Sequence, residues 1–151
     1  MAPRSQRLEP ILQLKQRQQD DVARQVAERD RVLAEQQERL EALQRYADEY
    51  SAPPVAATTI NPALLANRMA FRAKLEQAVE HQSRIVDSNR ERCDVERARL
   101  LLASREKHVM EKLAASYRAA EERVADQKTQ RELDDLGARR VRNAASGNTT
   151  P

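Results

Sequence analysis

Glycine is nearly absent from this chain, whose 151 residues include only two, Gly137 and Gly147. Loops that cradle phosphate groups need several glycines, and neither GxGxxG nor GxxxxGK[ST] occurs. The metalloprotease pattern HExxH and the nucleophile pattern GxSxG are missing as well. We therefore expect no enzyme, no cofactor and no small-molecule substrate.

Aromatic residues, cysteine and long apolar runs are also scarce. With no Trp, one Phe and three Tyr, the chain has little material for a globular core. Its single cysteine, Cys93, cannot form an internal disulfide, which favours a reducing compartment. There is no apolar run of about 18 residues and no apolar segment near the N-terminus. We expect a soluble, intracellular protein.

The chain is rich in charged and helix-forming residues. Charged residues make up 34% of it, and neither Gly nor Pro follows Pro62 until Gly137. Such a run predicts one α-helix of roughly 110 Å, with a composition typical of coiled coils. On that helix His81 and His108 would stand about 40 Å apart, too far to share a metal ion.

The breakers divide the chain into five expected segments. These are a frayed N-terminus (1–9), a first coiled-coil helix (10–50), a proline-containing turn (51–61), a second long helix (62–136) and a basic, then disordered, C-terminal tail (137–151). Asn61 suits an N-cap before Pro62, and Ile60 with Leu65 suits a hydrophobic staple. The turn lets the chain reverse, so the predicted fold is an all-α antiparallel two-helix coiled-coil hairpin with a longer second helix.

Both helices show the alternating 4-3 spacing of a coiled-coil seam. In the first helix, nine of thirteen seam positions are apolar: Leu8, Leu12, Lys15, Gln19, Val22, Val26, Arg29, Leu33, Gln36, Leu40, Leu43, Ala47 and Tyr50. In the second, eleven of nineteen are apolar: Leu65, Arg68, Arg72, Leu75, Val79, Gln82, Val86, Asn89, Cys93, Glu96, Leu100, Ala103, Lys107, Met110, Ala114, Tyr117, Glu121, Val124 and Lys128.

The two helices differ in length. If Tyr50 lies opposite Pro62, then Pro10 lies opposite Leu102, and 103–136 extends beyond the first helix by about 50 Å. The apolar stripe on that extension would lack a partner within the chain, and such a stripe expects another protein or a second copy. Its residues are Val109, Met110, Leu113, Tyr117, Ala120 and Val124.

Four segments resemble the flagellar export protein FliJ family. They are RLEPILQLKQRQQDDVARQ at the start, LQRYADEY at the end of the first helix, NRMAFRAKLEQAVEHQ after the turn, and the late QKTQRELDDLGARR. The moderately specific feature is YxxEY combined with FxxxLxxAV, and the resemblance covers nearly the whole chain.

The resemblance implies a non-enzymatic component of the flagellar type III protein export apparatus, which serves motility. Family members look like the central stalk of rotary ATPases. They bind and promote assembly of the hexameric export ATPase, link it to the cytoplasmic domain of the membrane export gate, and escort export chaperones. This implies a cytoplasmic protein, peripherally associated with the inner membrane at the flagellar basal body.

The resemblance also implies two partner-binding regions. The gate-binding positions that match are Phe71, Leu75, Ala78 and Gln82; the family pattern can have His at the last place, whereas here His81 comes one residue earlier. The ATPase-facing end would comprise the chain's start and the extension, including Val109, Met110, Leu113, Tyr117 and Val124.

Three alternatives stay open. One is the equivalent stalk protein of a virulence type III secretion system, and another is a general coiled-coil scaffold that associates weakly with itself. The third is a nucleic-acid binder that uses the tail residues Arg139, Arg140 and Arg142. Because residues 62–136 carry fifteen basic and fourteen acidic side chains, with no basic stripe, we expect no nucleic-acid partner.

Overall fold

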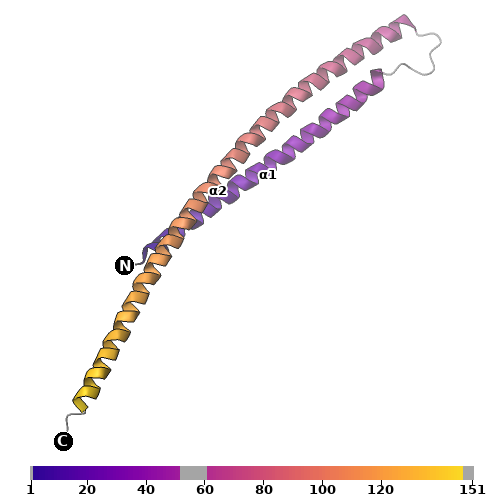
Figure 1. The fold of residues 1–151 in the computed structure, drawn as a ribbon. Coiled ribbons are helices and arrows are strands. Elements are labelled where there is room, and N and C mark those ends of the chain that lie inside the picture. Colours follow the sequence, from indigo (N-terminus) through magenta and orange to yellow (C-terminus); the bar gives the residue numbers. More distant parts are fainter. Residues whose placement is uncertain (1, 52–60, 148–151) are drawn as a thin grey trace. The chain divides into compact units, whose positions relative to one another are not determined.

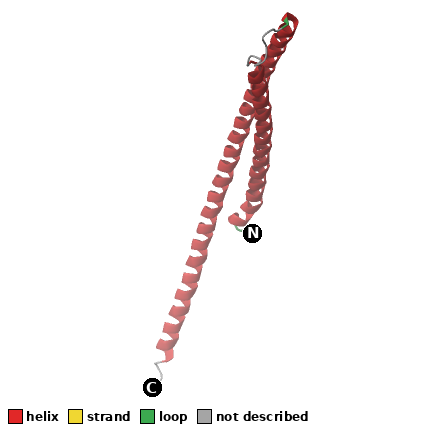
Figure 2. Cartoon of the chain, turned by 90° about the vertical axis from the view of Figure 1, so that its right-hand side faces the viewer, coloured by secondary structure: helices red, strands yellow, loops and turns green. Residues whose placement is uncertain are grey.

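The chain forms two helices and no strand within the residues that its computed structural model describes, 2–51 and 61–147. Helix α1 comprises Arg4–Ser51 and helix α2 comprises Pro62–Gly147 (Figure 1). Figure 2 shows helix along nearly all of the described chain. The predicted all-α hairpin with a longer second helix is therefore confirmed.

The chain divides into two compact units. The hairpin unit consists of Gln18–Ser104, and the terminal unit combines Met1–Arg17 with Arg105–Pro151. Each unit contains one stretch of α1 and one stretch of α2.

In the hairpin unit the two helices run antiparallel, side by side (Figure 1). Gln19 Nε2 donates to Ser104 Oγ at 3.1 Å, and Arg97 Nη2 donates to Asp30 Oδ1 at 2.9 Å. Further along, Gln82 bonds to Gln36, so α2 residue numbers fall as α1 numbers rise. The core between the helices is thin, since two helices cannot enclose a side chain from all sides. Of the described apolar side chains in this unit, only Val86 and Cys93 are fully buried.

In the terminal unit the start of α1 lies against the middle of α2. Lys15 Nζ pairs with Glu106 Oε2 at 3.1 Å, and Arg118 Nη2 pairs with Glu9 Oε2 at 3.7 Å. Ala114 is buried at 1% exposure. Its small side chain suits a position where the two backbones come close.

The pattern of burial confirms the predicted seam except near its ends, where the expected seam positions Tyr50, Leu65, Val124 and Lys128 are exposed. In α1 every predicted seam position from Leu8 to Ala47 is half-buried. In α2 every seam position from Arg68 to Glu121 is buried or half-buried except Arg72. The 4-3 spacing therefore identifies which side of each helix faces the other.

The expected register between the helices is wrong. The Tyr50 ring contacts Phe71, and the Tyr50 carbonyl accepts a hydrogen bond from Arg68, so Tyr50 does not lie opposite Pro62. The pairing starts further into α2 and continues to Glu121, which bonds to Ser5. The unpaired part of α2 therefore begins after Glu121, not at Ala103, and every residue of 122–147 is exposed.

Helix α1 begins at Arg4, earlier than the expected start at Pro10. The Pro3 carbonyl accepts the first helical bonds from the N–H groups of Gln6 (3.1 Å) and Arg7 (3.2 Å). The expectation that residues 4–9 are frayed is wrong because contacts with α2 hold this turn. Pro10 lies inside the helix, where its missing N–H costs one helical hydrogen bond.

Helix α2 starts as the sequence predicts and ends later. Asn61 Oδ1 accepts a hydrogen bond from the Ala63 N–H at 3.1 Å, which confirms Asn61 as the N-cap. The helix continues through Gly137, whose φ is not positive, so the expected stop there is wrong. A mid-helix glycine costs only about 1 kcal/mol, and good helix formers follow this one. The proposed staple residue Ile60, most of the predicted turn and residues 148–151 lie outside the described residues.

Candidate functional site

Phe71 forms the centre of the first candidate surface, in the hairpin unit. Its ring meets the Tyr50 ring edge-on, with centroids 4.7 Å apart and an interplanar angle of 61°. The Arg68 guanidinium lies over the other ring of this pair, 5.9 Å from the Tyr50 centroid. Phe71 is still 45% exposed, so its ring is both anchored on α1 and available to a partner.

The other gate-binding candidates face α1 to different degrees. Leu75 and Ala78 are half-buried. Gln82 is 8% exposed, and its Nε2 donates to the Gln36 carbonyl at 3.0 Å and to Gln36 Oε1 at 2.7 Å. The Gln82 side chain is thus committed to the hairpin, while the neighbouring His81 is exposed.

Two exposed apolar residues that precede Phe71, Leu64 and Met69, were not predicted to belong to any surface, and Leu65 was expected on the seam. Leu64 and Met69 are each 64% exposed, and Leu65 is 43% exposed. The sequence does distinguish this segment, because residues 62–75 contain three basic side chains and no acidic one. Elsewhere the helix surface carries closely mixed charges.

The second candidate surface, in the terminal unit, is built around Glu121. Its carboxylate accepts two hydrogen bonds from Ser5: from the backbone N–H at 3.0 Å and from the hydroxyl at 2.6 Å. Ser5 is in the first turn of α1, where backbone N–H groups lack helical partners. Glu121 therefore caps α1 from the neighbouring helix. The Ser5 hydroxyl and backbone bonds lower the pKa of Glu121, with a smaller contribution from Arg118.

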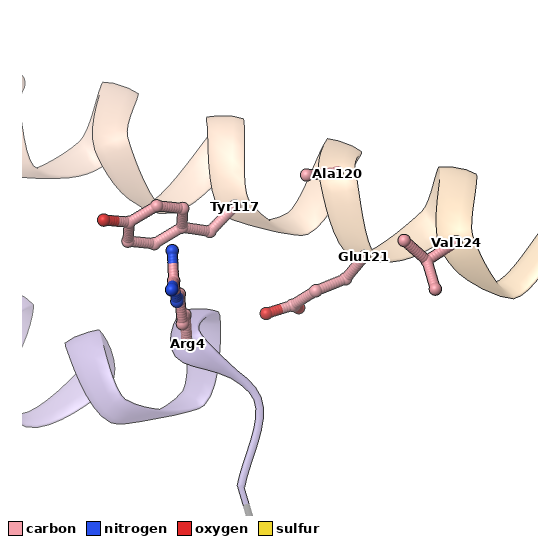
Figure 3. Close-up of a pocket in the computed structure, with 5 residues that line it drawn as sticks. All are labelled: Arg4, Tyr117, Ala120, Glu121 and Val124. Carbon is pink, nitrogen blue, oxygen red and sulfur yellow. The ribbon is translucent and has the colours of Figure 1, made fainter.

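A shallow concave surface lies beside this cap. It has a volume of about 280 Å³ and is lined by Arg4, Tyr117, Ala120, Glu121 and Val124 (Figure 3). The Arg4 guanidinium stands over the Tyr117 ring, 5.8 Å from its centroid. The lining is mostly hydrocarbon and ring, with one cation and one carboxylate, so it suits an apolar side chain from a polar-edged partner.

The five predicted ATPase-facing residues divide into two sets. Met110 and Tyr117 are half-buried on the seam against α1. Val109, Leu113 and Val124 point outward, with exposures of 63%, 38% and 66%. Sequence reasoning missed Arg4 because the expected register paired the start of α1 with a different part of α2.

The described residues contain no group of three or more metal-ligating side chains close enough to hold an ion. Neither helix, over its described length, includes a segment apolar enough to cross a membrane. The Cys93 thiol is buried in the seam, where burial and the nearby Asp30 raise its pKa. Such a thiol is a packing element and a poor nucleophile.

A family model described as "Flagellar FliJ protein" matches residues 4–146. No curated protein and no solved structure matches the chain.

Proposed function

Because the chain belongs to the flagellar FliJ protein family, a component of flagellar type III export, we propose that it is the stalk-like coiled coil of the export ATPase complex. In this role it binds the hexameric ATPase, promotes its assembly and activity, and links it to the cytoplasmic domain of the membrane export gate. Export chaperones are further partners. It works in the cytoplasm, peripherally at the inner membrane beneath the flagellar basal body, and acts by protein contact alone. The flagellar description of the matched family favours this role over a virulence stalk.

The observation that supports the ATPase contact is the unpaired end of α2. Every residue of 122–147 is exposed, so this part of α2 lacks the tertiary packing that supplies most helical stability in proteins. Val124 follows the last α2 residue paired with the start of α1, and it lines the concave surface beside Tyr117. A partner that covers this end would bury an apolar row and stabilise the helix at once. We assign Val109, Leu113 and Val124 to direct contact, with Met110 and Tyr117 holding that row against α1.

The gate contact is assigned to the surface around Phe71. A half-exposed aromatic ring, fixed by an edge contact, loses little conformational entropy on binding and suits an anchor. Leu75 and Ala78 continue the row along α2. Gln82 acts as a positioning residue, because its hydrogen bonds to Gln36 hold this part of α2 against α1.

The test adds the purified protein to the export ATPase and measures hydrolysis and ring formation. The expected result is stimulation of both at micromolar concentration. Val124→Glu should abolish the stimulation, since it places a carboxylate on the exposed apolar row. Val95→Glu is the matched control, because Val95 is also on α2 and 53% exposed but belongs to the hairpin unit. Absence of stimulation by the unmodified chain would contradict the proposal.

A second candidate function, a self-associating scaffold, is favoured by a different observation. Leu133, Leu136 and Val141 are between 55% and 70% exposed on the unpaired part of α2. Light scattering at several concentrations distinguishes the two functions. If the chain is a self-associating scaffold, the unmodified chain should have the mass of a dimer. The Leu133→Glu variant should then have the mass of a monomer.

A further inference from the structure

The first three turns of α2 carry an exposed apolar surface that neither candidate site uses. Leu65 and Met69 are 43% and 64% exposed, and Ala66, Ala70 and Ala73 beside them are exposed too. These five residues follow i, i+1, i+4, i+5, i+8 spacing, so they share one side of the helix. We call this side the tip face.

The tip face points away from α1. The seam residues of this region, Arg68 and Leu75, are half-buried and lie on the other side of α2. Phe71 is on the flank next to that seam, since its ring contacts Tyr50. The tip face is thus a separate surface from the one assigned to the gate, and it does not depend on that assignment.

The charged residues within the segment that carries the tip face, 62–75, are all basic. Arg72 borders it on the side of Leu65, and Lys74 borders it on the side of Ala70, as helical spacing requires. Residues 62–75 contain no Asp or Glu. Arg72 and Glu76 form an i, i+4 ion pair at 3.3 Å, but both side chains are exposed, so the pair is weak. A partner carboxylate can therefore share or replace it.

We propose that the tip face docks an α-helix of another protein whose apolar strip is bordered by acidic residues. The three alanines let a second helix approach closely, while Leu65 and Met69 fit between its side chains. Acidic residues along both edges of that strip would meet Arg72 and Lys74. The tip face is long enough for such a contact, since its three helical turns extend over roughly 16 Å before Glu76 and Glu80 interrupt it.

Two other occupants fit less well. A second copy of the same face would bring Arg72 and Lys74 against their own equivalents, which like-charge repulsion disfavours. An anionic membrane would attract these basic residues but repel Asp48 and Glu49 in the last turns of α1, where Tyr50 reaches Phe71. A partner helix can carry its carboxylates only where they face Arg72 and Lys74, whereas a lipid surface would also bring negative charge to Asp48 and Glu49.

The test measures binding of two synthetic amphipathic peptides to the full-length chain by fluorescence anisotropy. Both peptides carry the same Leu/Ala strip, edged by Glu in one and by Lys in the other. The Glu-edged peptide should bind roughly tenfold more tightly or better, and salt should weaken it. The double substitution Arg72→Glu, Lys74→Glu should reverse the preference. Equal binding of both peptides, or no saturable binding of either at millimolar concentration, overturns the proposal.

Further variants test the location and the alternatives. Met69→Glu, and separately Ala70→Gln, should each abolish peptide binding while helical circular dichroism stays unchanged. Ala98→Gln is the matched control, because Ala98 is also exposed on α2 in the hairpin unit but lies outside the tip face. This variant should bind the peptide normally. Peptide binding that survives both Met69→Glu and Ala70→Gln overturns the proposal. So does binding to phosphatidylcholine–phosphatidylserine vesicles without peptide binding, or self-association that Met69→Glu removes.

Discussion

Ser5 and Glu121 are 116 residues apart in the sequence and form two hydrogen bonds, at 3.0 Å from the Ser5 N–H and at 2.6 Å from its hydroxyl. Pro3, which precedes the helix, has no side-chain acceptor that could cap α1 itself. A carboxylate from α2 supplies that acceptor, at the end of the helix where negative charge is favoured. The start of α1 is therefore specified by α2.

The first prediction concerns this cap. Glu121→Ala should loosen the first turn of α1, because the N–H and hydroxyl of Ser5 lose their acceptor. Heteronuclear NOE values of the Arg4–Gln6 amides should fall. Glu122→Ala is the control, since Glu122 is exposed next to the cap and its substitution should leave these values unchanged. Equal rigidity in the Glu121 variant would show that the turn is stabilised in another way.

The second prediction is the pH dependence of the same turn. The pKa of Glu121 is lowered from its ordinary value of 4.5, so the folded state favours the carboxylate. A lowered pKa contributes stability that is present above the unfolded pKa and lost as pH falls through the folded one. The Ser5 amide resonance should therefore titrate at a pH below 4.5 in the full chain. Titration at or above that value would contradict the capping geometry.

The third prediction concerns the buried amide pair. Gln82→Ala should destabilise the hairpin by about 1 kcal/mol in urea denaturation, because the half-buried acceptors of Gln36 lose their donor. The double substitution Gln36→Leu, Gln82→Leu should recover most of this loss, since it replaces both amides by apolar groups. If the double variant is as unstable as Gln82→Ala, the two amides contribute more than the hydrogen bonds that they make with each other.

The fourth prediction separates binding from packing at Phe71. Phe71→Ala removes an edge-on ring contact worth about 0.5–1.5 kcal/mol, so the helical circular dichroism should persist. Binding to the cytoplasmic domain of the export gate should be lost in a pull-down or titration. Leu101→Ala, at a 54% exposed position elsewhere on α2, should bind normally. Equal loss of fold and of binding would make Phe71 a core residue only.

The seam could be predicted from sequence because burial in a two-helix pair depends on helical period alone. Leu33, Val86 and even polar Gln82 are on the predicted side, since a regular 4-3 spacing leaves no choice of face. The register could not be predicted in the same way. The seam contains polar residues at many positions, so sliding one helix along the other exchanges similar contacts. Local contacts at Tyr50, with Arg68 and Phe71, decide the register instead.

The candidate sites show the same limit. Phe71 could be identified from its family pattern and its position off the seam, and its exposure agrees with a partner role. Arg4 could not, because its place over Tyr117 depends on the register and on a helix start that needs Glu121. Sequence spacing predicts what lies along one helix. It does not predict which residues of two helices meet.

The last prediction concerns the unpaired end of α2. A chain that ends at Val124 should have a free energy of unfolding within about 0.5 kcal/mol of that of the full chain. The reason is that every described residue beyond Val124 is exposed and contributes little packing. The truncated chain should nevertheless stimulate the export ATPase less, since a partner would keep Val109, Leu113 and Val124 but lose the exposed helix that follows them. Urea denaturation and the hydrolysis assay measure the two effects independently. A loss of several kcal/mol would mean that this end packs on the rest of the chain. Full stimulation without it would confine the ATPase contact to the residues up to Val124.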